Sequence, residues 1–259
     1  MKLALYQVDA FTDRVFGGNA AAVCPLESWI EDELMLKIAA ENNLAETAFF
    51  VPDGDGYHLR WFTPSNEVEL CGHATLASAY VLFNHLGFAG DQVRFRAIAG
   101  ELNVKREGDL YALDFPSRPP TRIEPPAQLV EALGTEPDEF WKARDHVAVY
   151  ADEQHVKALT PDMVKLQAFD MYALIVTAPG RDVDFVSRFF APSHGIPEDP
   201  VTGSAHCTLI PFWAERLGKS SLRALQVSKR RGELFCELQG DRVKIAGRAA
   251  LYLEGQISV

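Results

Sequence analysis

The sequence predicts an α/β (α+β) protein of two pseudo-symmetric halves, each a curved sheet wrapped around one central helix. An internal repeat is the main observation: residues 72–87 recur at 203–218, and residues 100–109 recur at 232–241 with nearly the same spacing. Repeats in this order imply two similar units, each about half of the chain. Two like units that face each other form a cleft, and clefts between domains commonly bind small ligands.

Short strands are expected around the first repeated segment. Apolar and alternating stretches predict strands at 3–10, 20–25, 45–51 and 57–63, and an amphipathic helix at 30–41. Strands outnumber helices in this part of the chain, so each half should be mainly sheet.

The two repeated segments are expected to contain buried helices, over 74–86 and 205–217. Both are apolar around nearly their whole circumference, and a helix of that kind must be enclosed by other elements. Because the flanking segments are mostly short strands, the sheet of each half should curve around its helix. Pro211 should kink the second helix locally, since proline lacks the N–H of a helical hydrogen bond.

A proline-rich stretch is expected to separate the halves. Residues 116–126 contain five prolines and no apolar periodicity, which is typical of a connector. We therefore expect an N-terminal half at 1–116, a connector at 117–127 and a C-terminal half at 128–259.

Composition argues against several classes of function. The chain has 36 acidic and 25 basic residues and a net charge of −11, which disfavours nucleic acid as a partner. It has no run of about 18 apolar residues and no signal-peptide core, so a cytoplasmic protein without a membrane partner is expected. The four cysteines and seven histidines follow no ligand spacing, so neither a metal site nor a disulfide framework is expected.

Each repeated helix is expected to begin directly after a glycine, at Gly72 and at Gly203. The first N–H groups of a helix lack partners within it, and the helix dipole makes that end positive. Two such helix starts facing one cleft would hold a small carboxylate without any Arg or Lys. The alternative is that both glycines only permit tight turns and that Ser204 caps a helix.

The two copies differ in their polar residues, which suggests chemistry on an asymmetric substrate. His73 stands where the second copy has Ser204, and Asp199 precedes only the second helix. An acid–base site needs such differences, whereas a symmetric scaffold does not. Alternatively, His73 is a hydrogen-bonded histidine near a helix start, and Asp199 is a turn residue before proline.

Glu46 is the one charged residue in the apolar, strand-like stretch 43–50. Burial raises the pKa of a carboxyl group, so Glu46 could act as acid and base near neutral pH; the alternative is an ordinary outward-facing strand residue. Cys71 precedes the first Gly-His pair, where a helix dipole would lower its pKa and make it a thiol base. Its counterpart in the second copy lies near Pro200 and Val201, which cannot supply a second base.

Several motifs occur together in one order: FGGNAAAV at 16–23, LAETAFF at 44–50, FTPSNEVELCGHATLASAYV at 62–81, LDFP at 113–116 and EDPVTGSA at 198–205. Together they resemble the PhzF-like isomerases of the phenazine-biosynthesis family, and AGRAALYLEGQI at 246–257 is similar to the closing strands of that family. Ala20 stands where many members have proline, which is expected to affect the turn and not the chemistry. This family shares its fold with diaminopimelate epimerase and proline racemase, in which each half is a strand barrel around a central helix.

The resemblance also implies roles for individual residues. Glu46 would be the general acid/base that removes a proton from a substrate carbon and returns it elsewhere, with His73 and Asp199 orienting the substrate and assisting proton transfer. The substrate-binding residues that it implies are Asn19, Cys71, Gly72, Gly203 and Ser204. It implies no cofactor and no metal.

Three functional hypotheses follow. The first is a cofactor-independent isomerase that moves a proton on a small carboxylic-acid substrate in the interdomain cleft, and the resemblance implies a homodimer. The second is an epimerase or racemase that uses Cys71 as one base. The third is a non-catalytic protein that binds a small acid.

Overall fold

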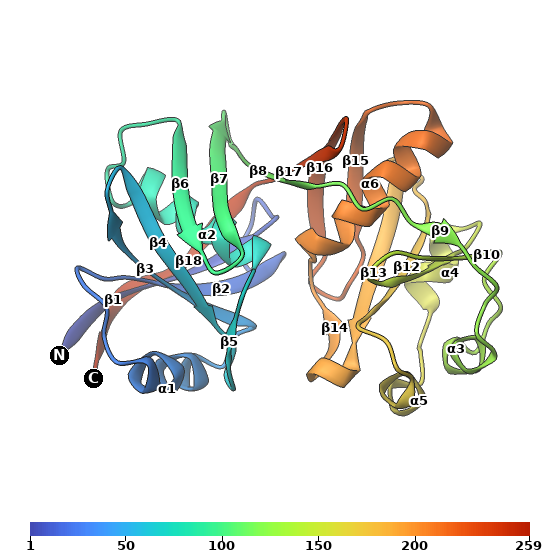
Figure 1. Cartoon of the computed structure of the whole chain (residues 1–259), viewed down its shortest axis with the longest axis horizontal. Coiled ribbons are helices and arrows are strands. Elements are labelled where there is room, and N and C mark those ends of the chain that lie inside the picture. Colours follow the sequence, from blue (N-terminus) through green and yellow to red (C-terminus); the bar gives the residue numbers. More distant parts are fainter. The chain divides into compact units, whose positions relative to one another are not determined.

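The computed structural model describes residues 1–259 as two compact units. Unit 1 comprises Met1–Asp114 and Ala246–Val259, and unit 2 comprises Phe115–Ile245. In Figure 1 the red C-terminal strand lies beside the blue N-terminal strand, because the two strands pair in the sheet of unit 1. No helix of the chain is both long and apolar enough to cross a membrane.

Unit 1 is a mixed sheet with two helices. Its strands are β1 Lys2–Ala10, β2 Asn19–Pro25, β3 Glu46–Asp53, β4 Gly56–Phe62, β5 Glu67–Val68, β6 Gln92–Ala97, β7 Gly100–Glu107, β8 Leu110–Pro116 and β18 Ala249–Ser258, and its helices are α1 Asp32–Asn42 and α2 Gly72–Asn84. Neighbouring strands pair in the order β18–β1–β2–β3–β4–β6–β7–β8. The pairs β2/β3 and β4/β6 are parallel, the other pairs are antiparallel, and the short β5 lies beside β4.

Unit 2 contains the remaining elements. Its strands are β9 Thr121–Arg122, β10 Glu139–Lys142, β11 His146–Val149, β12 Leu174–Pro179, β13 Phe185–Ala191, β14 Ile196–Asp199, β15 Ser221–Gln226, β16 Gly232–Gln239 and β17 Arg242–Gly247, and its helices are α3 Ala127–Leu133, α4 Glu153–Ala158, α5 Met163–Ala168, the 3₁₀ turn Pro192–His194 and α6 Gly203–Leu217. The strands pair in the order β9–β10–β11–β12–β13–β15–β16, with β11/β12 and β13/β15 parallel.

Strand for strand, the pairings of unit 2 repeat those of unit 1. In both units the sequence of pairs from the outer strand is antiparallel, antiparallel, parallel, antiparallel, parallel and antiparallel. The short strand β5 beside β4 has its counterpart in β14 beside β13, and each is followed by the long central helix. The predicted fold of two pseudo-symmetric α/β halves is confirmed.

The boundaries of the two units differ from those expected from the prolines. Residues 246–259 pack with unit 1, because β18 pairs with β1 along its length, from Lys2 opposite Ser258 to Ala10 opposite Ala249. In unit 2 the corresponding place beside β10 is taken by β9 from the proline-rich segment. Each unit therefore completes its sheet with a strand from outside its repeated segment.

The two central helices begin two residues earlier than expected. Gly72 and Gly203 are the first residues of α2 and α6, and the caps are Cys71 and Thr202 in extended backbone conformations. A glycine at the first helical position still presents its N–H outward, so the helix starts remain as the repeat predicts.

Pro211 lies inside α6, and it leaves the carbonyl of Cys207 without a helical donor. The backbone N–H of Arg118 donates to that carbonyl at 2.8 Å. The proline-rich segment is therefore attached to α6 and is part of unit 2. The local kink expected at Pro211 stays a prediction.

Both central helices are enclosed. Ten of the 13 residues of α2 and 11 of the 15 residues of α6 are buried. Helix α2 contacts β1, β2, β3 and β7 of its own sheet, and α6 contacts β15 and β16. Because their sides are covered by sheet, the helix ends are the places where polar chemistry is available.

Gly18, in the turn before β2, is required by its backbone conformation and by its neighbours. Its φ is +58°, and an added Cβ would lie 2.0 Å from the carbonyl oxygen of Ala10. Gly54, in the turn between β3 and β4, also has a positive φ, at +64°, but an added Cβ meets nothing within 4 Å. Substitutions at Gly18 and Gly54 therefore distinguish the cost of a positive φ from the cost of a steric clash with the added Cβ.

We predict that Gly18→Ala lowers the free energy of unfolding by more than about 3 kcal/mol, because the clash adds to the left-handed penalty. Gly54→Ala should cost only about 1 kcal/mol, the left-handed penalty alone. Urea unfolding of both variants measures the difference. Equal losses would show that the turn before β2 relaxes around a methyl group.

Candidate active site

The parallel pair β2/β3 brings two polar side chains to one edge of the unit 1 sheet. Asn19 begins β2 and Glu46 begins β3, and Glu46 pairs with Ala21 two residues further along β2. Parallel strands start at the same edge, so both residues lie at the edge where α2 also begins. Thr75 secures this first turn of α2, donating its hydroxyl to the carbonyl of Cys71 at 2.6 Å.

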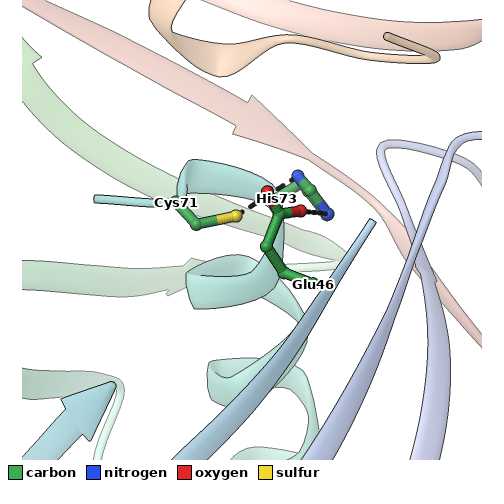
Figure 2. A group of neighbouring side chains, drawn as sticks. All are labelled: Glu46, Cys71 and His73. Carbon is green, nitrogen blue, oxygen red and sulfur yellow. Dashed lines mark hydrogen bonds and ion pairs between the residues drawn. The ribbon is translucent and has the colours of Figure 1, made fainter. Parts of the chain in front are cut away.

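Glu46, Cys71 and His73 form one cluster at this helix start, as Figure 2 shows. His73 Nε2 lies 3.1 Å from Glu46 Oε2, and the Cys71 Sγ lies 3.5 Å from His73 Nδ1. The side-chain amide of Asn19 contacts the same Nδ1 at 3.3 Å. His73 therefore stands at the centre, with Glu46 on one side of its ring and Cys71 and Asn19 on the other.

The contact between Glu46 and His73 is a buried ion pair. The side chains are 13% and 7% exposed, and Glu46 Oε2 faces His73 Nε2 at 3.1 Å. A carboxylate oxygen that accepts and a ring nitrogen that can donate thus lie side by side at the start of α2.

The pKa values of the pair move in opposite directions. Burial alone would raise the pKa of Glu46, but the charge and hydrogen bond of His73 outweigh it and hold that pKa below its usual value. Burial alone would lower the pKa of His73, but Cys71 and Glu46 raise it well above its usual value. The raised pKa expected for Glu46 from burial is therefore wrong, because the interaction with His73 reverses the effect. The directions of the two shifts favour a carboxylate beside an imidazolium.

Cys71 is a neutral thiol in this environment. Burial raises its pKa to about 11, and the nearby charge of Glu46 acts in the same direction. The lowered pKa expected from the helix dipole is therefore wrong, since removal from water outweighs the dipole. At pH 7 such a thiol is ionised to about one part in 10⁴.

The three side chains of the cluster are of types that zinc accepts, and their ligand atoms lie within 4.8 Å of one another. Their arrangement is nevertheless that of a hydrogen-bonding chain. His73 directs one ring nitrogen toward Cys71 and the other toward Glu46, so a single ion could not be bound by all three without side-chain rotation.

The other predicted site residues, Asp199, Gly203 and Ser204, gather at the start of α6 in unit 2. The helix caps align Cys71 with Thr202, so the counterpart of Cys71 is Thr202 and not Pro200 or Val201. Asp199 accepts a hydrogen bond from the Thr202 hydroxyl. A hydroxyl thus stands where the first copy has a thiol.

Sequence reasoning missed two residues at this second helix start. Arg144 donates from Nη2 to Ser204 Oγ at 3.1 Å and pairs with Asp145, so an arginine lies at this helix start, where none was expected. Gln226 bonds Thr202. Arg144 follows β10, and no sequence motif marks it. Gln226 lies on the buried face of β15 with Leu222 and Ala224, so the alternation of residues in this strand could have identified it as a buried polar residue.

Comparison with known proteins identifies the family. The family model described as phenazine biosynthesis-like protein (PhzC-PhzF) matches residues 8–255. The chain belongs to this family. An uncharacterized isomerase of Pseudomonas aeruginosa is 51% identical over 257 residues, with 99% of each chain covered. The isomerase expected from the sequence agrees with the name of this relative.

Solved structures support the same assignment. A PhzF-family protein of Enterococcus faecalis is 48% identical, with a TM-score of 0.98 and all of both chains covered. A hydroxyproline epimerase of Agrobacterium vitis, with bound trans-4-hydroxy-L-proline, is 12% identical with a TM-score of 0.64 over 99% of this chain and 92% of its own. The second likeness shows the fold alone, and it agrees with the expectation that this fold is shared with epimerases.

We predict that Cys71 resists alkylation in the folded protein. With a pKa of about 11, it should react with iodoacetamide at pH 7 at least about 100-fold more slowly than free cysteine, because only the thiolate is the nucleophile. Peptide mass spectrometry measures the labelling, and the urea-unfolded chain is the control. Labelling of folded Cys71 at the rate of free cysteine would contradict the neutral thiol.

Proposed function

We propose that the protein, an isomerase by its family, moves a proton on a small carboxylic acid without a cofactor, with Glu46 as general base and acid. The observation that carries the proposal is the buried Glu46–His73 ion pair at the start of α2. It holds a carboxylate that is ready to accept a proton beside an imidazolium that can donate one.

Glu46 would remove a proton from a substrate carbon and return it at another position. The negative charge that develops on the substrate would be stabilised by His73 and by the free N–H groups at the start of α2. The same N–H groups, at Gly72 and His73, suit the substrate carboxylate. Asn19 and Cys71, which both contact His73, would keep its ring in place.

Residues at the start of α6 are proposed to assist. Asp199 would orient the substrate and take part in proton transfer, and Ser204 with the N–H of Gly203 would bind an anionic group. Arg144 donates to Ser204 Oγ while its guanidinium is paired with the Asp145 carboxylate, so it would hold the Ser204 hydroxyl in position for the ligand.

The second candidate is an epimerase or racemase with Cys71 as a base. The 3.5 Å contact between Cys71 Sγ and His73 Nδ1 favours it, because an imidazole at that distance could accept the thiol proton. The raised pKa of Cys71 and the already protonated state of His73 disfavour it. We therefore place Glu46 first.

We predict that Glu46→Gln abolishes exchange of solvent deuterium into the substrate while the protein stays folded. The loss should be at least about 10²-fold, since general acid–base catalysis contributes 10²–10⁴-fold. Exchange is measured by NMR in D₂O with a panel of cyclic and amino-substituted carboxylic acids that includes trans-4-hydroxy-L-proline. Glu41→Gln, on the exposed side of α1, is the matched control. Full exchange by Glu46→Gln would exclude Glu46 as the base.

Cys71→Ser separates the two candidates. If Glu46 is the base, exchange should fall at most about tenfold; if Cys71 is a base, it should fall by 10²-fold or more. Loss of exchange in Cys71→Ser with retention in Glu46→Gln would establish the epimerase. Binding of an acid by calorimetry with no exchange for any member of the panel would support a non-catalytic protein.

A further inference from the structure

A buried side chain, Gln226, forms hydrogen bonds with the turn that leads into α6. This residue ends β15, and it is fully buried. It contacts the turn 199–203 through both ends of its amide. Ser228 makes a further attachment, donating its hydroxyl to the carbonyl of Pro200 at 2.8 Å.

The hydrogen bonds of Gln226 leave no doubt about how its amide is oriented. Its Oε1 accepts the backbone N–H of Thr202 at 2.8 Å, and its Nε2 donates to the backbone carbonyl of Asp199 at 2.8 Å. A backbone N–H can only donate and a carbonyl can only accept, so a flipped amide would lose both bonds.

This orientation fixes the direction of the next two bonds. The second N–H of Gln226 Nε2 donates to Thr202 Oγ1 at 3.1 Å. The hydroxyl of Thr202 therefore accepts from Gln226, and its own proton points to Asp199 Oδ2, with which it makes a short hydrogen bond. Asp199 Oδ2 is therefore the acceptor of the hydrogen bond from Thr202.

We propose that Gln226 is a positioning residue for the reaction: through the Thr202 hydroxyl it holds the Asp199 carboxylate in one orientation as a hydrogen-bond acceptor. The proposal rests on the proposed function, in which Asp199 assists proton transfer.

The other unit shows that Gln226 is not needed to build the fold. Ala97 ends β6 at the matching place: it pairs with Gly100, as Gln226 pairs with Gly232, and these two glycines begin the repeated Gly-Glu-Leu segment. An alanine thus completes the same strand and sheet in unit 1. The amide at 226 serves the one helix start that carries Asp199.

Gln226→Glu is the sharpest test, because it keeps the shape and removes both amide donors. The Thr202 hydroxyl should then donate to the new carboxylate instead of to Asp199. We expect kcat for proton exchange to fall at least about tenfold, the fold-change for losing a hydrogen bond to a charged group, with KM within threefold. Gln128→Glu, exposed on α3, is the matched control and should keep both constants.

Variants at Thr202 keep the test decisive if Gln226→Glu does not fold. Thr202→Val removes the hydroxyl and should reproduce the fall in kcat at unchanged KM, whereas Thr202→Ser keeps the hydroxyl and should restore kcat to within threefold of the parent. A folded Gln226→Glu or Thr202→Val with parental kcat would overturn the proposal. So would a change in KM alone.

A readout without substrate separates this proposal from the proposed function. In the parent protein both side-chain amide protons of Gln226 are hydrogen-bonded, so NMR should show them exchanging with water at least about tenfold more slowly than those of the exposed Gln128. In Thr202→Val one of the two protons loses its acceptor and should exchange faster. Exchange as fast as in Gln128 would overturn the proposal, and a parent protein that exchanges no acid would overturn only the proposed function.

Discussion

A helix that is apolar on every side has to be removed from water on every side, and this constraint governs both units of the protein. Neither α2 nor α6 could stand on the surface of a flat sheet, so each is covered by the strands of its own unit. The strand pairings that achieve this are the same in both units. The helix starts are then the natural position for polar side chains, because the N–H groups there need partners and carry positive charge.

The cluster at the start of α2 illustrates how two costs can cancel. A buried carboxylate and a buried imidazolium are each unfavourable, yet at 3.1 Å each supplies the countercharge of the other. The third member, Cys71, stays a neutral thiol because burial raises its pKa. The same thiol position in unit 2 is a hydroxyl, bound between Gln226 and Asp199. One scaffold thus presents two different sets of proton donors and acceptors.

Local sequence patterns were sufficient for the two central helices and the internal repeat, and insufficient for the contacts that polar side chains make with distant segments. The apolar circumference of 74–86 and 205–217 predicted enclosed helices, and the repeat predicted two similar halves, because both properties are written in consecutive residues. The direction of the Glu46 pKa was not predictable in this way, since burial was visible in 43–50 but the neighbouring imidazolium is 27 positions away in the chain. Arg144 and the return of β18 to β1 were missed for the same reason: each depends on a contact between distant segments.

The return of β18 has a consequence for synthesis of the chain on the ribosome. Strand β18 follows the whole of unit 2 in the chain, yet it pairs with β1 of unit 1, where the backbone N–H of Val259 donates to the carbonyl of Met1 at 2.9 Å. Unit 2 is contiguous and has all its residues once position 245 has emerged. Unit 1, which holds Glu46 and His73, gains its outer strand only after residues 249–258 have also emerged. Translation thus sets an order of assembly in which the unit that carries the ion pair is the later of the two to close.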